Sequence, residues 1–512
     1  MDKTDIDVTE MPVADVQDGY ARGAFSCEAL TQAFLDRIAR LNPRLNAVIF
    51  VNPDALADAR AVDARRRAGE PLGPLAGVPV VVKDTMDMVG FPSTGGWSLL
   101  CSKTGGIDLM PGTDSPVVAR LRAAGAIILG KTNVPILSSS GTDANNSWAG
   151  PTLNAVAPDR APGGSSAGTA TAVAASMAVL GLAEETGGSI QNPAAAQALV
   201  SIKPTFALVP NTGVMPLASQ RDVVGPIARC VRDAALTLDV LAGVTIDDPK
   251  TAASVGRIPE GGYTSLLSGT ALQGRRLGLY GPGWRNQPLT PETEALYTHA
   301  QQELAARGAT LITDPFVGTG FAGLRQPTSE TNEFDARGLE SAAHDLQNYL
   351  RRMGPQAALQ SFAQFAEATK AQDAFGPHGV LHDLNLLPGF AEALARPDVM
   401  PPMAEFMAAR ASYLRIFNAV MDSQQLDALV FPQARAELPP LHGEVQIAET
   451  TVSEINIAGL PGVTVPAGSY ACGAPFGLIF VGRLFSEATL LACAHDYEQA
   501  TRHRRAPAPN RF

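Results

Sequence analysis

Residues 115–130 read SPVVARLRAAGAIILG, a helix pattern that leads directly into a strand pattern. Ser115 and Pro116 suit the start of a helix, and Gly125 suits its end. The apolar run that follows, residues 126–130, is typical of a buried strand. A helix that closes on glycine and continues into an apolar strand is the alternation from which α/β sheets are built. The stretch therefore predicts an α/β fold.

Other segments extend this pattern along the chain. Residues 78–82 form a β-branched apolar run that predicts a buried strand, and Lys83 stands at its end. Upstream, Ser26 can cap a helix with a periodic apolar face, and a second helix is expected over residues 54–69. Further strands are expected at residues 275–280, 428–432 and 476–482.

The chain has 512 residues, enough for one very large domain or two to three smaller ones. Residues 325–425 carry helical stretches and no clear strand, so we interpret them as a helical insertion or cap. It would lie beside a core of about residues 25–320 and 425–505. No linker rich in glycine and serine marks a flexible boundary, so we expect residues 1–512 to form a single domain.

Composition and charge argue against several classes of protein. The net charge is −11, the pI is about 5.2, and no dense Lys/Arg run provides the basic face that nucleic acid requires. The five cysteines include no CxxC pair, which indicates neither zinc nor a disulfide framework and fits a reducing cytoplasm. The acidic N-terminus is unlike a secretory signal, and the longest charge-free stretch, residues 161–183, is weakly apolar. We expect a cytoplasmic protein with no nucleic-acid or membrane partner.

Three short motifs suggest cofactors but fail on their context. Residues 125–132 match the P-loop pattern, yet their centre reads as a strand. Residues 318–323 match GxGxxG, yet Pro327 follows where a dinucleotide-binding helix must form. His378 and His382 have the spacing of helical zinc ligands, but proline and glycine beside them disfavour a helix. We expect no metal and no cofactor, and no motif supports a Ser-His-Asp triad.

Two glycine-serine motifs downstream of Lys83 carry a different chemistry. The first, PGGSSAG at residues 162–168, precedes an Ala-rich run at 169–180 that predicts a helix, and the second is EETGGSI at 184–190. Serine is a weak nucleophile unless a base removes its proton, which a neutral lysine can do without histidine. Burial next to the valine run would lower the lysine pKa from its free value of about 10.4. The glycines allow successive N–H groups to converge on one oxyanion.

With these motifs the sequence resembles the amidase signature family. GVPVVVKD (77–84), APGGSSAGTA (161–170) and ETGGSI (185–190) are similar to the family's three catalytic motifs, in the family's order. The resemblance covers about residues 25–505, including GAIILGKTN (125–133). It implies a single α/β domain around a large mixed sheet flanked by helices. It also implies a serine hydrolase that cleaves carboxylic amides through an acyl-enzyme.

The resemblance implies a role for each residue of these motifs. Ser189 would be the nucleophile, Lys83 the base, and Ser165 the relay between them. In the family a cis peptide bond usually precedes the relay serine, here between Gly164 and Ser165. The residues expected to form the oxyanion hole and to bind substrate are Thr186, Gly187, Gly188, Ser139 and Gly141.

The chain departs from the family's usual pattern at three positions. Ala167 stands where the family often has glycine, Glu185 where it often has aspartate, and Gln191 where it often has arginine. None of these changes removes a catalytic group. Gln191 does put in doubt any role that an arginine plays there.

Several functions remain open within this family. The first is a stand-alone amidase for a small-molecule amide, and the alternatives are an esterase or aryl acylamidase and a glutamine-dependent amidotransferase subunit. The intact catalytic set argues against a binding protein without activity. We predict hydrolysis by the isolated chain, with neutral, partly apolar acyl groups preferred over glutamine. Phe334, Leu346 and Tyr349 are expected to line a mostly apolar cleft, and a homodimer is expected.

Overall fold

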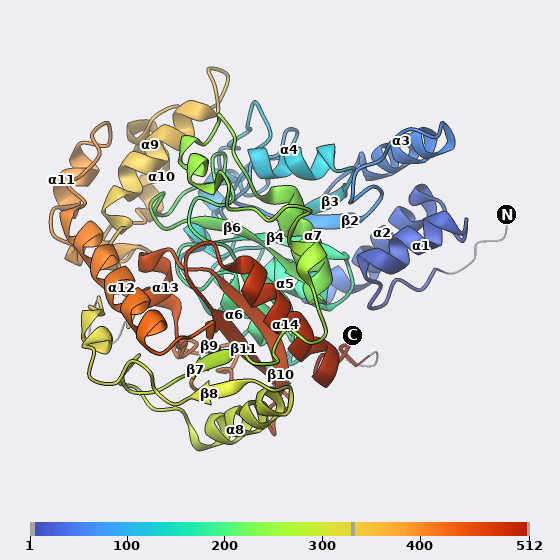
Figure 1. Ribbon diagram of the computed structural model, residues 1–512. Helices are drawn as coiled ribbons and strands as arrows, with labels where there is room; N and C mark the ends of the chain where they lie inside the picture. Colours follow the sequence, from blue (N-terminus) through green and yellow to red (C-terminus); the bar gives the residue numbers. More distant parts are fainter. Residues whose placement is uncertain (1–5, 329–332, 509–512) are drawn as a thin grey trace.

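The computed structural model describes residues 6–328 and 333–508, and a large mixed sheet forms its centre (Figure 1). The strands are β1 (Val48–Val51), β2 (Pro79–Lys83), β3 (Ile127–Thr132), β4 (Leu180–Glu185), β5 (Val200–Lys203), β6 (Val223–Ala228), β7 (Arg276–Leu279), β8 (Thr310–Ile312), β9 (Ala428–Pro432), β10 (Gly462–Ser469) and β11 (Pro475–Val481). Across the described residues they form one 11-stranded sheet in the order β1-β3-β2-β4-β6-β5-β10-β11-β9-β7-β8. The pairs β2/β3, β2/β4, β7/β8 and β7/β9 are parallel and the other pairs are antiparallel. The predicted single α/β domain with a mixed sheet is confirmed.

Helices surround the sheet. The α-helices of the described residues are α1 (Val13–Ala21), α2 (Cys27–Leu45), α3 (Ala55–Arg67), α4 (Pro116–Ala123), α5 (Ala167–Ala174), α6 (Gln191–Ala196), α7 (Val231–Leu241), α8 (Pro291–Ala306), α9 (Ala342–Arg352), α10 (Phe362–Thr369), α11 (Phe390–Ala395), α12 (Ala404–Ser423), α13 (Val452–Ala458) and α14 (Glu487–Thr501). The short 3-10 helices are η1 (Ser98–Leu100), η2 (Ser102–Thr104), η3 (Ile136–Ser138), η4 (Pro249–Ser254), η5 (Tyr263–Leu266), η6 (Phe321–Leu324), η7 (Leu339–Ser341), η8 (Lys370–Gln372) and η9 (His382–Leu386). Within residues 6–328 and 333–508, none of the helices has the length and apolar character needed to cross a lipid bilayer.

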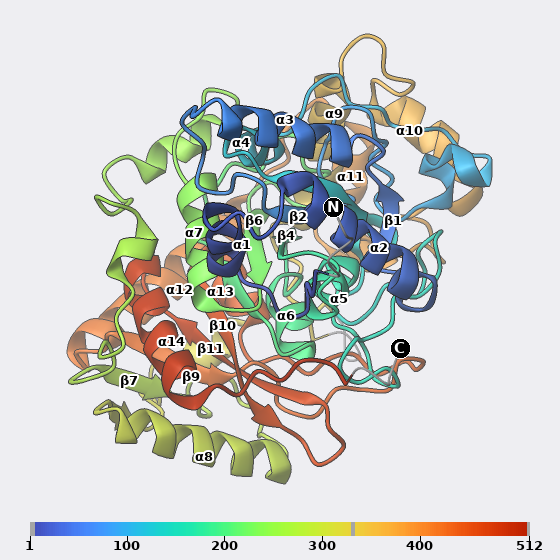
Figure 2. The same cartoon turned by 90° about the vertical axis from the view of Figure 1, so that its right-hand side faces the viewer.

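The middle of the sheet is covered on both faces. Helix α7 packs on β5 and β6, and α14 packs on β10, while α5 packs on β2 and β4 and α6 packs on β5, β10 and β11. Figure 2 shows α7 and α14 on one side of the sheet and α5 and α6 on the other. Strands β2 to β6 are fully buried along their length, because a sheet covered on both faces needs apolar side chains in both directions.

Several of the expected elements form where the sequence predicts them. The Ser26 hydroxyl accepts a hydrogen bond from the Ala29 N–H at 3.0 Å and so caps α2. Helix α4 and strand β3 occupy the 115–130 stretch, and the centre of the apparent P-loop is part of β3 itself. The predicted strands at 275–280, 428–432 and 476–482 correspond to β7, β9 and β11.

The expected helical run ends earlier than the sequence predicts. The Ala-rich stretch 169–180 was expected to be helical throughout, but α5 ends at Ala174 and β4 begins at Leu180. Between them Ser176 adopts a φ of 55°, in the left-handed region that ends helices. The run contains no glycine, proline or asparagine that would mark this helix end in the sequence.

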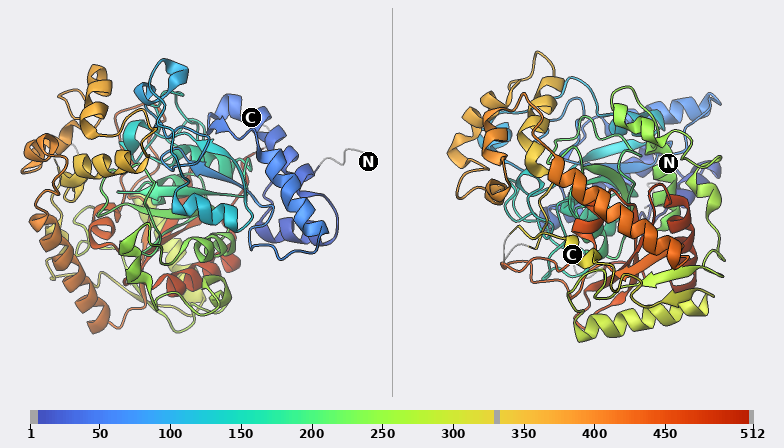
Figure 3. Two further views of the ribbon diagram at one scale, coloured as in Figure 1. Left: turned by 90° about the horizontal axis from the view of Figure 1, so that it is seen from above. Right: turned by 60° about the vertical axis from the view of Figure 1, so that its left-hand side comes forward.

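The helices between β8 and β9 do not pack as one unit. Helices α9 to α11 pack over a separate apolar cluster with Trp97, Leu137 and Met215, whereas α12 joins a second cluster around Trp284 and Phe316. Figure 3 shows α9 to α12, in yellow to orange, at the end of the molecule opposite the N-terminal helices in blue. The 325–425 insertion with these boundaries stays a prediction, and its helices divide between two sites on the core.

Candidate active site

Lys83 ends the buried strand β2, and its side chain is fully buried. Its amine donates to the Ser165 hydroxyl oxygen at 2.6 Å and to the Glu184 carboxylate at 2.6 Å. Burial lowers the pKa of Lys83 below its ordinary value, and the Glu184 carboxylate opposes that effect. The site therefore holds a lysine whose proton affinity is set by two competing influences.

Ser165 belongs to the loop that precedes α5. The Gly164–Ser165 peptide bond is cis, and the Gly164 N–H donates to the Gly141 carbonyl oxygen at 3.0 Å. Gly163 has a φ of 76°, and a Cβ there would lie 2.4 Å from the Pro193 Cα. This close approach of two backbones requires glycine.

Ser189 lies in the loop between β4 and α6, and Glu185 anchors this loop. The Glu185 carboxylate accepts hydrogen bonds from the Ile190 N–H at 2.8 Å, the Gln191 N–H at 3.1 Å and the Asn456 side chain at 2.7 Å. The Gln191 side-chain amide also donates to Glu185, and its carbonyl oxygen accepts from Thr451 at 3.0 Å. Glu185 and Gln191, two of the departures from the family pattern, thus have a defined structural role next to Ser189.

The backbone around Ser189 offers free donors. The N–H groups of Gly187, Gly188 and Ser189 donate to no acceptor among residues 6–328 and 333–508. The Thr186 hydroxyl is not part of this set of free donors, because it donates to Asp222. Burial and the nearby Glu184 carboxylate raise the pKa of Asp222 to about 7, while the Thr186 hydrogen bond opposes them. Free N–H groups next to a serine can stabilise a developing oxyanion.

A cleft of about 1060 Å³ opens over this loop. Five of the predicted site residues line it: Ser139, Gly141, Thr186, Gly187 and Ser189. Lys83 and Ser165 are fully buried, and Ser189 is 5% exposed. Among the described hydrogen bonds, the structure brings Lys83 and Ser165 together but shows none between the Ser165 and Ser189 hydroxyls.

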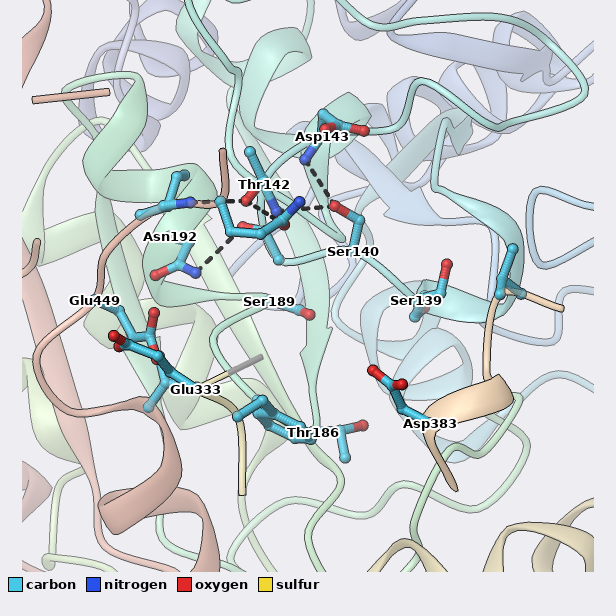
Figure 4. A pocket seen from close by; sticks show the side chains of 18 of the residues that line it. Ser139, Ser140, Thr142, Asp143, Thr186, Ser189, Asn192, Glu333, Asp383 and Glu449 are labelled. Carbon is cyan, nitrogen blue, oxygen red and sulfur yellow. Dashed lines mark hydrogen bonds between the residues drawn. The ribbon is translucent and has the colours of Figure 1, made fainter. Parts of the chain in front are cut away.

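The walls of the cleft are more polar than the sequence suggested. Its apolar lining includes Leu217, Phe334, Leu381, Leu384 and Val452. Its carboxylates are Asp143, Glu333, Asp383, Glu444 and Glu449. Figure 4 shows Ser189 in the middle of the view, with Ser139 and Asp383 on one side and Glu333 and Glu449 on the other. Arg435 also lines the cleft and pairs with Glu333 at 2.9 Å.

Two predicted lining residues lie elsewhere. Leu346 and Tyr349 were expected in the cleft with Phe334, but both are buried in the apolar cluster beneath α9. The Tyr349 hydroxyl donates to the Asp87 carboxylate at 2.7 Å. The amphipathic pattern of α9 predicts that one face of the helix is buried, and in the structure that face packs onto the core and not into the cleft.

Sequence reasoning missed Glu184 and Asp222. Glu184 and Glu185 are consecutive in a strand, so their side chains point to opposite faces of the sheet. That alternation places the two carboxylates on opposite faces of the sheet, but which of them meets Lys83 depends on the pairing of β4 with the parallel strand β2. Asp222 carries no comparable signal, because its position next to Thr186 arises only from the pairing of β4 with β6.

Comparisons with known proteins agree with this site. Residues 29–491 match the Amidase family. The chain is 34% identical over 490 residues to a glutamyl-tRNA(Gln) amidotransferase subunit from Thermosynechococcus vestitus, covering 93% of this chain and 95% of that one. It is 34% identical to the solved peptide amidase from Stenotrophomonas maltophilia, with a TM-score of 0.79 over 98% of each chain. A bacterial aryl acylamidase at 24% identity shares the fold, with a TM-score of 0.78 over 96% of this chain and 97% of that one. The chain therefore belongs to the Amidase family and is an enzyme of this amide-hydrolysing group.

Proposed function

We propose that this chain cleaves the C–N bond of a carboxylic amide through an acyl-enzyme on Ser189. The observation that carries the proposal is the 2.6 Å contact between the buried Lys83 amine and the Ser165 hydroxyl, near a cleft that Ser189 lines. A buried lysine that touches a hydroxyl and loses its proton more readily than a free lysine suits general-base catalysis.

The proposed reaction uses the chain's own groups in sequence. Neutral Lys83 takes the Ser165 proton while Ser165 takes the Ser189 proton, and the Ser189 oxygen attacks the amide carbonyl. The N–H groups of Gly187, Gly188 and Ser189 stabilise the oxyanion. The proton then passes to the leaving nitrogen, and water releases the carboxylate from Ser189. The relay requires the Ser165 and Ser189 hydroxyls to approach, and catalytic hydrogen bonds commonly tighten only when substrate is bound.

The first amide donor to consider is glutamine. The 34% identity to a glutamyl-tRNA(Gln) amidotransferase subunit over 93% of this chain supports the amidotransferase alternative more strongly than the stand-alone amidase expected from the sequence. In that case the chain would act with partner proteins, and the ammonia released at Ser189 would pass to a second reaction.

The second candidate is a stand-alone amidase for a larger amide. The cleft of about 1060 Å³ is at the upper end of the range for small-molecule sites and has both apolar and acidic walls. The equal 34% identity to a solved peptide amidase supports an extended amide substrate.

The test is an assay of the purified chain alone on glutamine, an aliphatic amide, an aryl amide and a short peptide amide, with free ammonia or amine measured. Ser189→Ala is the matched control for contaminating amidases. Turnover of the organic or peptide amides that depends on Ser189 supports the stand-alone enzyme. Glutamine hydrolysis that appears only with added amidotransferase partners supports the role in a complex. Activity on any of these amides that Ser189→Ala retains in full, in proportion to the amount of purified protein, contradicts the proposed reaction.

A further inference from the structure

The Glu184 carboxylate and the Lys83 amine are buried side by side in the site. The Glu184 carboxylate lies 2.6 Å from the Lys83 amine, and the two side chains are 2% and 0% exposed. The Lys83 amine also contacts the Ser165 hydroxyl at 2.6 Å and the Glu184 backbone carbonyl at 3.3 Å. Three oxygen atoms therefore fix the direction of the amine, and one of them belongs to the proposed relay serine.

The Glu184 carboxylate has no other task in the described structure. Glu185, on the opposite face of β4, holds the Ser189 loop through backbone N–H groups. For the Glu184 carboxylate, the side-chain partner recorded among residues 6–328 and 333–508 is Lys83. Burying a carboxylate costs free energy unless it is paired, so its place beside the proposed base needs an explanation.

We propose that Glu184 is a positioning residue for amide cleavage, whose carboxylate holds the Lys83 amine on Ser165 and stabilises the ammonium that forms when Lys83 takes the serine proton. The inference rests on the proposed function. In the step concerned, the O–H bond of Ser165 breaks and an N–H bond forms on Lys83. The positive charge then lies beside the ionised carboxylate until the proton passes to the leaving nitrogen. The aspartate of a Ser-His-Asp triad acts on its histidine in the same way.

The electrostatics of the site give this role a measurable signature. Burial lowers the pKa of Lys83, and Glu184 is the strongest of the groups that raise it. Asp222, from the segment before β6, and Glu185, from β4, are the other carboxylates that act on Lys83 in the same direction. Removing the Glu184 charge should therefore let Lys83 lose its proton at lower pH and make it a weaker base.

The test measures the rate at which a fluorophosphonate labels Ser189 as a function of pH, which requires no knowledge of the substrate. In Glu184→Gln we expect the rising limb of the labelling rate to move to lower pH by about one unit or more. We expect the plateau rate to fall roughly tenfold or more. Glu184→Leu should move the limb in the same direction, and it replaces Glu184→Gln in the test if the glutamine variant does not fold.

Two control variants separate this role from other causes. Glu487→Gln removes another fully buried carboxylate, which accepts a hydrogen bond from the Thr205 N–H, and should leave the limb unchanged. Asp222→Asn is scanned because burial raises the pKa of Asp222 to about 7, so Asp222 titrates itself, and because its charge also raises the pKa of Lys83. A limb that moves in Asp222→Asn but not in Glu184→Gln overturns the inference, as does an unchanged plateau and limb in both Glu184 variants. If the wild-type Ser189 is not labelled, the proposed function fails first and this inference with it.

Discussion

The Lys83 amine donates to the Ser165 hydroxyl oxygen at 2.6 Å, and both side chains are fully buried. We predict that Lys83→Arg and Lys83→Met each lower kcat/KM by about 10³-fold. A guanidinium cannot lose its proton inside a protein, and methionine has no amine, so neither can act as a base. Steady-state hydrolysis by the folded variants, checked by circular dichroism, measures the effect. An arginine variant with more than a tenth of the wild-type rate contradicts general-base catalysis by Lys83.

The pH profile of the wild-type enzyme is a second test of Lys83 as the base. Burial lowers the pKa of Lys83, so the rising limb of kcat/KM should lie below the free lysine value of about 10.4. Below the limb Lys83 is protonated and cannot accept the serine proton, and above it the rate should level off. Residual activity in Lys83→Met should show no such limb.

Replacing Ser189 and replacing Ser165 should have different effects on catalysis. Ser189→Ala should abolish turnover and fluorophosphonate labelling, because no covalent bond can form. Ser165→Ala should slow acylation by about 10²-fold or more and leave measurable activity, because a relay passes a proton without becoming acylated. Single-turnover kinetics with an activated ester or anilide distinguishes the two. Equal and complete loss in both variants, with the fold intact, would contradict the assigned roles.

Glu185 should support the Ser189 loop more than the chemistry. Its carboxylate accepts two backbone hydrogen bonds at the start of α6. In Glu185→Gln the side-chain NH₂ group is itself a donor, so it cannot accept hydrogen bonds from these N–H groups. We expect the free energy of unfolding to fall by about 1–3 kcal/mol, measured by urea titration, together with a lower kcat. Glu70→Gln is the control, because Glu70 is half-exposed and makes a surface ion pair with Arg65. Equal stability of the two variants would contradict the anchoring role.

The sequence predicted the local parts of the site better than its assembly. Lys83 at the end of an apolar strand and the serines in glycine-rich loops are local patterns, and the structure places Lys83 against Ser165. Their catalytic roles stay predictions. Glu184 was missed because its importance depends on β4 lying beside β2, which is a long-range pairing that no local pattern encodes.

The same limit explains the errors in the fold. Strands β2 and β3 were predicted because β-branched residues dominate them, whereas the end of α5 at Ala174 was missed because the alanine-rich run continues past it to Leu180 without a glycine or proline. Leu346 and Tyr349 were placed in the cleft because the apolar face of a helix predicts that the face is buried. The pattern does not say which part of the protein covers that face. The polar walls of the cleft come from segments as distant as Asp143 and Glu444, whose meeting depends on the whole topology.

Tyr349 should anchor α9 to the loop after β2 in a pH-dependent way. Its hydroxyl donates to Asp87, whose pKa burial raises to about 6 while this hydrogen bond lowers it. A carboxyl with a raised pKa in the folded state loses stabilisation as the pH rises from about 4 to 6. Tyr349→Phe raises that pKa further, so the loss of stability, roughly 1–2 kcal/mol, should be largest above about pH 6. Urea unfolding at pH 5 and pH 8 measures it.

The matched control is Tyr263→Phe, because the buried Tyr263 hydroxyl has no hydrogen-bond partner among the described residues. Its removal should be neutral or slightly stabilising at both pH values. A Tyr349→Phe variant that behaves like Tyr263→Phe would show that the Asp87 contact contributes no stability.

Gly187 should be required because a larger side chain does not fit there, and not because its backbone needs a conformation that only glycine adopts. A Cβ at Gly187 would lie 2.3 Å from Cε2 of Phe334, the aromatic ring on the cleft wall that also stacks on Arg221 at 4.8 Å. Gly187→Ala keeps the N–H group, so a lower rate must come from displacement of the loop or the ring. We predict a fall in kcat/KM of about 10²-fold, since a displacement of about 1 Å at a reacting group costs that much.

Phe334→Ala alone should raise KM with little change in kcat, because it removes a side chain from the cleft wall and no hydrogen-bond donor. The double variant Gly187→Ala/Phe334→Ala should recover at least about tenfold over Gly187→Ala, because the steric conflict is gone. If kcat/KM in the double variant equals the product of the two single losses, the residues act independently and Gly187 is required for another reason.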